Sequence, residues 1–207
     1  MSVITTYCHL TADICAVNGD IVARRDPDSN DSWFKQIYKE QEILYPKFYK
    51  MDALSQAGFL ASELIKRANP GLIADYGDDE IALVFANKTS SSETDQRFVH
   101  SYEHNGAPSP SLFVYTLPNI VLGEIAIANK WFGENIFAVL PKFVPEFFIN
   151  YGRIMMPARA KAMLCGWLEF FGGEVHVFLF FVENRDKKGL NFDSEELLKM
   201  SDLHAAN

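Results

Sequence analysis

Apolar and polar positions alternate near the start of the chain, which is the spacing of a strand with one buried face. Residues 3–16 carry β-branched and aromatic side chains in a loose alternation, and residues 20–22 continue it after an Asn18-Gly19 pair. Asn-Gly is the strongest short signal for a turn between two strands. This region therefore predicts a short hairpin, and the polar stretch 23–32 that follows predicts a surface loop.

The pattern then changes to the three- and four-residue steps of an amphipathic helix over 50–68, which Asn69-Pro70-Gly71 ends. The apolar positions that carry this pattern are Leu54, Ala57, Ala61, Leu64, Ile65 and Ala68. An apolar run of strand length follows at 80–86, and the hydroxyl-rich segment after it suits a loop and a helix cap. We therefore expect a strand followed by a helix.

The second half of the chain is more apolar. Residues 109–118 lead into a predicted buried helix over 119–131, where we expect Gly123 to interrupt the helix and to permit close approach of another backbone. A short strand at 135–140, a helix from Pro141 onward and a capped helix beginning at Asp193 complete the prediction.

The apolar run 162–182 is long enough to raise the question of a membrane span. It contains Glu169, Glu174 and His176 close to its middle, where charges are costly in lipid. Gly172-Gly173 instead favours two strands joined by a tight turn, because diglycine accepts the positive φ angles of such turns. We therefore expect a hairpin and no membrane span.

Strands that alternate with helices, some of them apolar throughout, indicate an α/β fold whose sheet is covered by helices on both faces. At 207 residues the chain fits a single domain over 1–207, which can bury roughly 70% of the surface that its unfolded form exposes. No internal repeat or low-complexity tract suggests a second unit.

Charge and cysteine content exclude some functions. Nineteen basic and 27 acidic residues leave a net charge of −8, which opposes the phosphate neutralisation that nucleic-acid binding requires. The cysteines, three in number, lack a paired spacing, and the sequence MSVITTYCHL does not have the layout of a signal peptide. These features predict a cytoplasmic protein that does not bind nucleic acid.

Few residues suggest chemistry. There is no glycine-rich phosphate loop, nucleophile-elbow serine or paired-cysteine zinc pattern, and we expect no cofactor. His100 and His104 lie one turn apart if their segment is helical and could offer two imidazoles to a metal. No third ligand is evident, so we favour an ordinary surface helix and no metal.

Two other groups of side chains have a structural and a functional interpretation. Cys8, Cys15 and Cys165 lie in apolar, strand-like contexts without a neighbouring base, so they are expected to act as small hydrophobic residues rather than nucleophiles. Four aromatic residues repeat at helical spacing, which favours core packing over the lining of a hydrocarbon-sized channel. These are Phe143, Phe147, Phe148 and Tyr151.

The segment SPSLFVYTLPNIVLGEIAIANKWFG, residues 109–133, resembles β-ketoacyl synthases of the thiolase-like superfamily. The matching positions are Ser109, Pro110, Asn119, Gly123 and Gly133. The likeness extends upstream to MDALSQAGFLASELI and downstream through AKAMLCGWLEFF and EVHVFLFFVE. Together with the alternating pattern, it implies a thiolase-like half with a mixed five-stranded sheet.

The resemblance also locates the family's nucleophile. In these enzymes an active-site cysteine begins the helix after the strand that follows Gly133, and ungapped counting puts Lys142 at that position. Pro141 and Phe143, one residue to either side, are not nucleophiles either. The family's two catalytic histidines belong to a second half, and this chain ends shortly after the first.

Within this resemblance, the chain is similar to half-length synthase-like proteins described as chain length factors. The resemblance implies a non-catalytic subunit of fatty-acid, polyketide or aryl-polyene biosynthesis, which pairs with a catalytic synthase or an acyl carrier protein. Two alternatives remain: an acyltransferase or condensing enzyme that uses Cys165 or a His100/His104 metal centre, and a homodimeric binding protein that kept only the fold.

The resemblance implies two contact regions as well. In the family the strand before the nucleophile pairs antiparallel with its copy, so the chain is expected to form a homo- or heterodimer. The matching strand here, 135–140, has few charges, and an apolar edge without charges invites pairing with another chain. The interface candidates are Asn135, Ile136, Phe137, Ala138, Val139 and Leu140. Leu112 and Phe113 are candidates for contact with an acyl chain, with ordinary core packing as the equal alternative.

Overall fold

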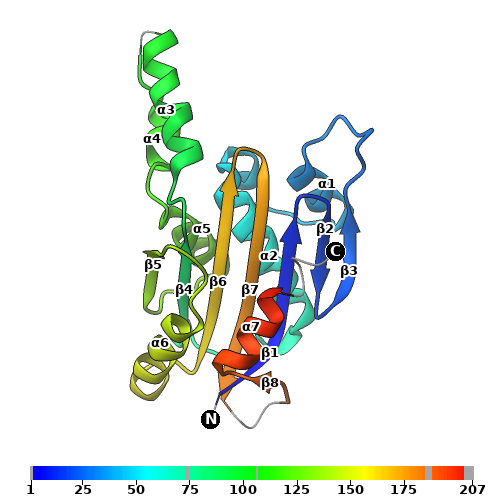
Figure 1. Cartoon of the computed structure of the whole chain (residues 1–207), viewed down its shortest axis with the longest axis vertical. Coiled ribbons are helices and arrows are strands. Elements are labelled where there is room, and N and C mark those ends of the chain that lie inside the picture. The colour runs from blue at the N-terminus through cyan, green and yellow to red at the C-terminus, as the bar shows by residue number, and fades with distance from the viewer. Residues whose placement is uncertain (1, 73–74, 106, 185–187, 203–207) are drawn as a thin grey trace.

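A computed structural model describes residues 2–72, 75–105, 107–184 and 188–202 of the chain. It contains one mixed sheet of eight strands in the order β3-β2-β1-β7-β6-β4-β5, and β8 pairs with β1 outside this path (Figure 1). The strands are β1 Ser2–Thr11, β2 Ile14–Val17, β3 Asp20–Arg24, β4 Ile81–Asn87, β5 Asn135–Val139, β6 Ala162–Phe171, β7 Glu174–Asn184 and β8 Leu190–Asn191.

The α/β class and the mixed sheet are confirmed, but the count of five strands is wrong. The apolar stretch 3–16 does not form one strand, because the chain reverses after Thr11 and the Thr11 hydroxyl accepts a hydrogen bond from the Ile14 amide at 3.2 Å. The turn at Asn18-Gly19 is where the pattern predicted it, and both residues have positive φ angles, 52° and 90°.

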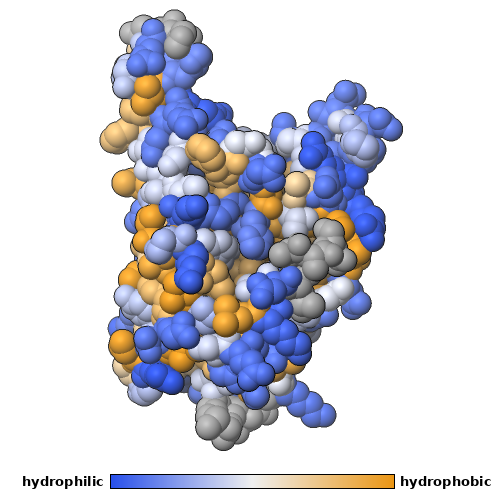
Figure 2. All heavy atoms as spheres, in the orientation of Figure 1, coloured by the Kyte–Doolittle hydropathy of each residue, from blue (hydrophilic) through white to orange (hydrophobic). Residues whose placement is uncertain are grey.

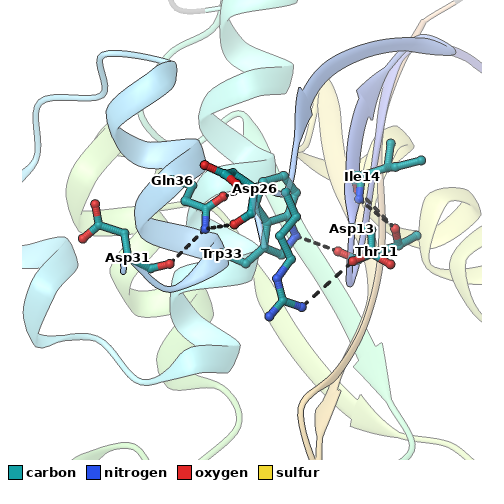
Figure 3. Close-up of polar contacts among 8 residues, drawn as sticks. Thr11, Asp13, Ile14, Asp26, Asp31, Trp33 and Gln36 are labelled. Atoms are coloured by element: carbon teal, nitrogen blue, oxygen red, sulfur yellow. Dashed lines mark hydrogen bonds and ion pairs between the residues drawn. The ribbon is translucent and has the colours of Figure 1, made fainter. Parts of the chain in front are cut away.

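The polar segment after β3 is held against the sheet. Trp33, at the start of α1 (Trp33–Glu40), donates its indole N–H to the Thr11 carbonyl at 2.8 Å, and Gln36 bonds the backbone of Asp26 and Asp31 (Figure 3). The predicted surface loop is thus real but ordered by side-chain bonds to its own backbone.

Helices cover both faces of the sheet, as predicted. One face carries α1, α2 (Ala53–Ala68) and α5 (Ile120–Asn129), and the other carries α6 (Pro145–Ala158) and α7 (Ser194–Asp202). Strand alternation divides the core between the faces: Phe85 packs with the first group and Val84 with the second, and both are fully buried. Short helices η1 (Pro46–Lys50) and η2 (Pro70–Leu72) flank α2.

The starts of α2 and α7 each have a capping side chain, and the sequence predicted the one at Asp193. Asp52 caps α2 by accepting a hydrogen bond from the Ser55 amide at 2.9 Å. Asp193 caps α7 in the same way through the Glu196 amide, also at 2.9 Å. Both predicted helices are confirmed to within a few residues at each boundary.

Gly172-Gly173 is the turn of the β6–β7 hairpin, with φ angles of 61° and 85°. The apolar run 162–182 therefore consists of two antiparallel strands, as predicted, and not of a helix. Within the residues that the structure describes, no helix is long and apolar enough to cross a membrane.

The role predicted for Gly123 is wrong. Helix α5 runs through this position without interruption, and a side-chain β-carbon there would meet nothing within 4 Å. Tight contacts lie at other glycines. For example, a β-carbon at Gly58 would be 2.6 Å from Leu168 Cδ2, and one at Gly133 would overlap the carbonyl of Ile81.

Helices α3 (Ser92–Asn105) and α4 (Pro110–Val114) form a hairpin that projects beyond the end of the sheet (Figure 1, top left). Ser109 caps α4 with its hydroxyl and Pro110 occupies the first helical position, so the Ser-Pro pair of the resemblance begins a helix.

Candidate functional site

Three parallel strands end side by side at one edge of the sheet. β4 pairs in parallel with both β5 and β6, and the Leu140 amide just after β5 bonds the Asn87 carbonyl at the end of β4 at 2.7 Å. In α/β sheets, ligands bind beyond the carboxyl ends of parallel strands. We therefore expect reactive or ligand-binding side chains in the segments that follow β4 and β5.

Lys142 lies at this edge, in the bend between β5 and α6, and is exposed. Helix α6 begins at Pro145, so the prediction of a helix from Pro141 is wrong and Lys142 is not in its first turn. The segment stays outside the helix because Phe143 inserts its ring among Phe148, Trp167 and Phe178, at centroid distances of 5.5–6.1 Å.

The loop after β4 is fixed by a carboxylate on β6. Glu169 accepts hydrogen bonds from the Lys88 amide and from the Thr89 hydroxyl, the latter at 2.7 Å. His176 lies opposite Glu169 in the β6–β7 ladder; burial lowers its pKa, and the charge of Glu169 acts in the opposite direction. Within the described chain, these groups at the edge include a base and a carboxylate but no thiol.

The three cysteines are buried away from this edge of the sheet. Cys165 is fully buried in the middle of β6, between β4 and β7, and burial raises the pKa of its thiol well above the usual value. Cys8 and Cys15 are also fully buried, with their sulfur atoms 4.0 Å apart, and this contact followed by burial raises the pKa of Cys8. A neutral, inaccessible thiol cannot attack a thioester.

The metal interpretation of His100 and His104 gains no support. Both belong to α3, and His100 is exposed on it, whereas the side chain of His104 lies outside the described residues. In the parts of the chain that can be described, no three His, Cys, Asp or Glu side chains gather in a way that could hold a metal ion.

The two acyl-contact candidates lie on α4. Phe113 is 62% exposed and contacts Phe98 of α3 at a ring-centroid distance of 5.5 Å. It is therefore not a core residue. Leu112 is half-buried and lines a groove of about 380 Å³ between the two helices, beside Arg97 and His100. The hairpin thus presents apolar side chains at the surface near the carboxyl ends of the strands.

A buried polar cluster that sequence reasoning missed holds this hairpin to the body. Tyr115 donates to Glu124 of α5 at 2.9 Å, and Lys47 of η1 pairs with the second oxygen of Glu124 at 2.8 Å. Thr94 of α3 donates to Asp52 at 2.7 Å. Burial, followed by the bond to Glu124, raises the pKa of Tyr115. Glu124 in the apolar run IVLGEIAIAN was the signal that could have revealed it.

Strand β5 is the last strand of the sheet path, and no described strand pairs with its outer edge. The Leu83 amide bonds the Glu134 carbonyl and the Leu140 amide bonds Asn87, so the even-numbered residues face β4. Backbone groups alternate along a strand, and those of Asn135, Phe137 and Val139 therefore point outward. Val139 is 55% exposed.

The aromatic residues of α6 belong to the core on the second face of the sheet. Phe148 is fully buried and stacks edge-on against Phe180 at 5.4 Å, while Phe147 contacts both Phe148 and Tyr151. Core packing, the favoured interpretation, is confirmed for these side chains.

Sequence comparison finds no protein-family model and no curated protein that matches this chain. Structure comparison does find matches. An acyl carrier protein in complex with its ketosynthase bound to a hexaketide (AntDE:AntF) gives a TM-score of 0.67 at 12% identity, and covers 89% of this chain and 63% of that one. The ishigamide ketosynthase/chain length factor gives 0.66 at 19% identity, with 90% and 63% covered.

A β-ketoacyl synthase from Burkholderia phymatum STM815 gives a TM-score of 0.59 at 13% identity and covers 89% of this chain and 59% of that one. The chain therefore spans about three fifths of the length of these structures. At such identities the comparison concerns the fold alone. The chain has the thiolase-like α/β fold of ketosynthase and chain-length-factor structures.

Proposed function

We propose that residues 1–207 form one non-catalytic ketosynthase-like domain, which acts as a chain-length-factor-like subunit in fatty-acid, polyketide or aryl-polyene biosynthesis. It pairs with a catalytic synthase, receives chains carried by an acyl carrier protein, and shapes the space that the growing acyl chain occupies.

The observation that carries this proposal is the side chain at the β5–α6 bend. A ketosynthase needs a thiolate there, and this chain has the exposed Lys142 in a segment that precedes the helix by three residues. An ammonium group at this place cannot form a thioester. The nearest cysteine in the sequence, Cys165, is buried in the sheet.

The outer edge of β5 supports the pairing role. Its outward backbone groups belong to Asn135, Phe137 and Val139, and the five residues NIFAV carry no charge that would discourage another strand. A partner strand placed there would extend both cores, because Phe137 packs toward one face and Ile136 and Ala138 toward the other. Leu140, just after the strand, packs on the same face as Ile136 and Ala138.

The apolar side chains of α4 support the role in acyl binding. Leu112 and Phe113 stand at the end of the molecule where the three parallel strands finish, on a hairpin that Glu124 and Asp52 anchor. Figure 2 shows that apolar side chains come to the surface along this side of the molecule, from α4 past β5 to α6. A hydrocarbon chain bound there would cover such groups.

The test is reconstitution with a full-length synthase that is encoded next to this chain and retains its active-site cysteine, together with an acyl carrier protein. Copurification at a fixed ratio and a product length that shifts in Phe113→Ala would support the proposal. The matched control is Tyr49→Ala, since Tyr49 is an aromatic residue of similar exposure, 49%, on η1. A chain that never copurifies, or products that both variants leave unchanged, would refute it.

A further inference from the structure

We propose that a cavity between α6 and the link from β8 to α7 binds a small monocarboxylic acid with an apolar body. The cavity lies at the opposite end of the sheet from the candidate site, where β1 begins and β7 ends (Figure 1). The proposal does not rest on the proposed function, because it concerns a separate part of the chain and a free ligand.

Three segments of the chain line this cavity, whose volume is about 810 Å³. Helix α6 forms one wall, and the paired ends of β1 and β7 form a second. The residues that connect β8 to α7 form the third. Small-molecule sites in proteins commonly measure about 300–1,000 Å³, so this volume suits a ligand of that kind.

Contacts within the chain hold the walls in place. A β-carbon at Gly152 would be 2.8 Å from Phe192 Cε1, so the glycine allows the Phe192 ring to pack against the backbone of α6. Ser2 of β1 donates its hydroxyl to the Met156 sulfur of α6 at 3.3 Å. Strand β8 is in turn paired with β1. The cavity is therefore already formed in the chain without a ligand.

The polar groups of the lining suit a carboxylate. Arg153 forms no ion pair or hydrogen bond with any residue that the structure describes, whereas Arg159, just after α6, pairs with Asp79. The side-chain amides of Asn184 and Asn191 also line the cavity and make no hydrogen bond within the described chain. A guanidinium group donates two parallel N–H bonds to a carboxylate, and the amides can donate others.

The other walls suit an apolar body. The side chains of Val3, Ile149, Met156 and Phe192 line the cavity and are half-buried, so a hydrocarbon group would cover their remaining apolar surface.

The charges of the lining limit the ligand to a single negative charge. Asp193 also lines the cavity, and one of its carboxylate oxygens accepts the Glu196 amide at 2.9 Å. Its charge would repel the second charge of a phosphate group. A saturated acyl thioester has no free carboxylate for Arg153, so the ligand differs from a chain that is attached to a carrier protein.

The experiment is an NMR titration of the isotope-labelled full chain with hydrocinnamate, and with hydrocinnamamide as its neutral counterpart of similar shape. We expect saturable shifts of the Gly152 and Asn191 amide signals with the acid. The dissociation constant should be at least about tenfold higher for hydrocinnamamide, because the charge-assisted bonds to Arg153 are lost. Arg153→Gln should raise the dissociation constant of the acid by a similar factor.

The matched control is Lys50→Gln, which also removes one positive charge. Lys50 is exposed on η1, which packs with the helices on the other face of the sheet, so hydrocinnamate should bind this variant as it binds the wild type. Arg153→Gln should fold normally because the arginine is exposed and has no described partner, and its urea midpoint provides the check.

Three results would overturn the proposal: no saturable shift up to about 10 mM ligand, a neutral amide that binds as tightly as the acid, or shifts centred on Phe113 of α4 instead of Gly152. Each of these would leave the proposed function standing. A chain that binds hydrocinnamate beside Gly152 but forms no complex with a synthase would reject the proposed function alone.

Discussion

Tyr115 links the α4 segment to the body of the molecule through a single hydrogen bond to a buried carboxylate. Glu124 accepts this bond and also pairs with Lys47, so it receives a partner on each oxygen. The neutral phenol is the form that fits between these groups, because a phenolate would be buried next to a carboxylate. This is why burial and Glu124 together raise the pKa of Tyr115.

A pH dependence follows. The pKa of Tyr115 lies higher in the folded chain than the ordinary value of 10.0 that applies to the unfolded chain. Its contribution to stability is therefore fully present below that pH and is lost as the pH rises above it. We expect Tyr115→Phe to be less stable than the wild type at pH 7 by about 1–3 kcal/mol, and the difference to shrink at higher pH. Urea unfolding at stepped alkaline pH measures this; a constant or widening difference would contradict the explanation.

Cys165 provides a second test at the level of one residue. Its full burial and raised pKa predict that a maleimide reagent will not modify it in the native chain and will modify it in urea. Cys8 and Cys15, equally buried, should behave alike and act as internal controls. Rapid native labelling of Cys165, found by peptide mass, would revive the alternative in which this thiol performs acyl transfer.

Among the elements, the loop that joins α5 to β5 passes close to the start of β4. Gly133 sits against the backbone of Ile81, the first residue of β4, and a methyl group there would overlap the Ile81 carbonyl. Backbone atoms cannot move aside as a side-chain end can. Gly123, ten residues earlier, has open space around it.

The two glycines therefore predict opposite results for the same substitution. Gly133→Ala should lower the free energy of unfolding by about 2 kcal/mol or more, through overpacking. Gly123→Ala should raise it by about 0.5–1 kcal/mol, through helix propensity. Urea denaturation of both variants, at a protein concentration too low for dimers to form, measures the two changes in the free energy of unfolding. Equal effects at the two positions would mean that the close approach at Gly133 is not what requires glycine.

The sequence predicted elements whose signals are local. Asn18-Gly19 and Gly172-Gly173 marked turns that need positive φ, and Asp193 marked a helix start, because each signal depends on the nearest few residues. The predicted start of α6 was wrong because it depends on distant residues. Pro141 and Pro145 are equally good first helical residues by local signals. The ring of Phe143 packs against β6 and β7, and this packing keeps the segment before Pro145 outside the helix.

The candidate site was predictable only in part. The resemblance identified Lys142, Leu112 and Phe113 by position, and the structure adds where they lie. Glu169 and Glu124 were not predictable as contacts, since their partners Thr89 and Lys47 are 80 and 77 residues away in the chain and nothing local announces them. Gly123 was expected to interrupt its helix and to permit close approach of another backbone, whereas the helix continues and no described part of the chain approaches it.

At the scale of the whole molecule, one edge gathers the features that point to a partner. The outward backbone groups of β5, the open side of α5 and the exposed Phe113 and Val114 of α4 lie on the same flank (Figure 1). The opposite edge, at β3, is a short hairpin strand beside which the polar segment after Arg24 is tied down by Gln36 and Trp33. The β5 flank is therefore the one on which we place the proposed pairing with a synthase.

The alternation of backbone groups along β5 decides which residue is suited to a proline substitution that tests pairing. Ala138 is even-numbered and its amide faces β4, so Ala138→Pro would weaken the sheet itself. Val139→Pro removes a donor that has no described partner in the chain alone, and edge positions tolerate proline. We expect Ala138→Pro to lower the urea midpoint and Val139→Pro to change mainly the association constant. The reverse order would show that the alternation along β5 was assigned wrongly.

The measurement that tests the central claim most directly is intact-mass analysis of this chain copurified with a catalytic synthase, after incubation with octanoyl-acyl carrier protein. We predict a stable complex in which the octanoyl group appears on the synthase and the mass of this chain is unchanged, because Lys142 stands where a thiol would be needed and Cys165 is buried. An octanoyl adduct on this chain that disappears in Cys165→Ala, or a chain that forms no complex, would contradict the account.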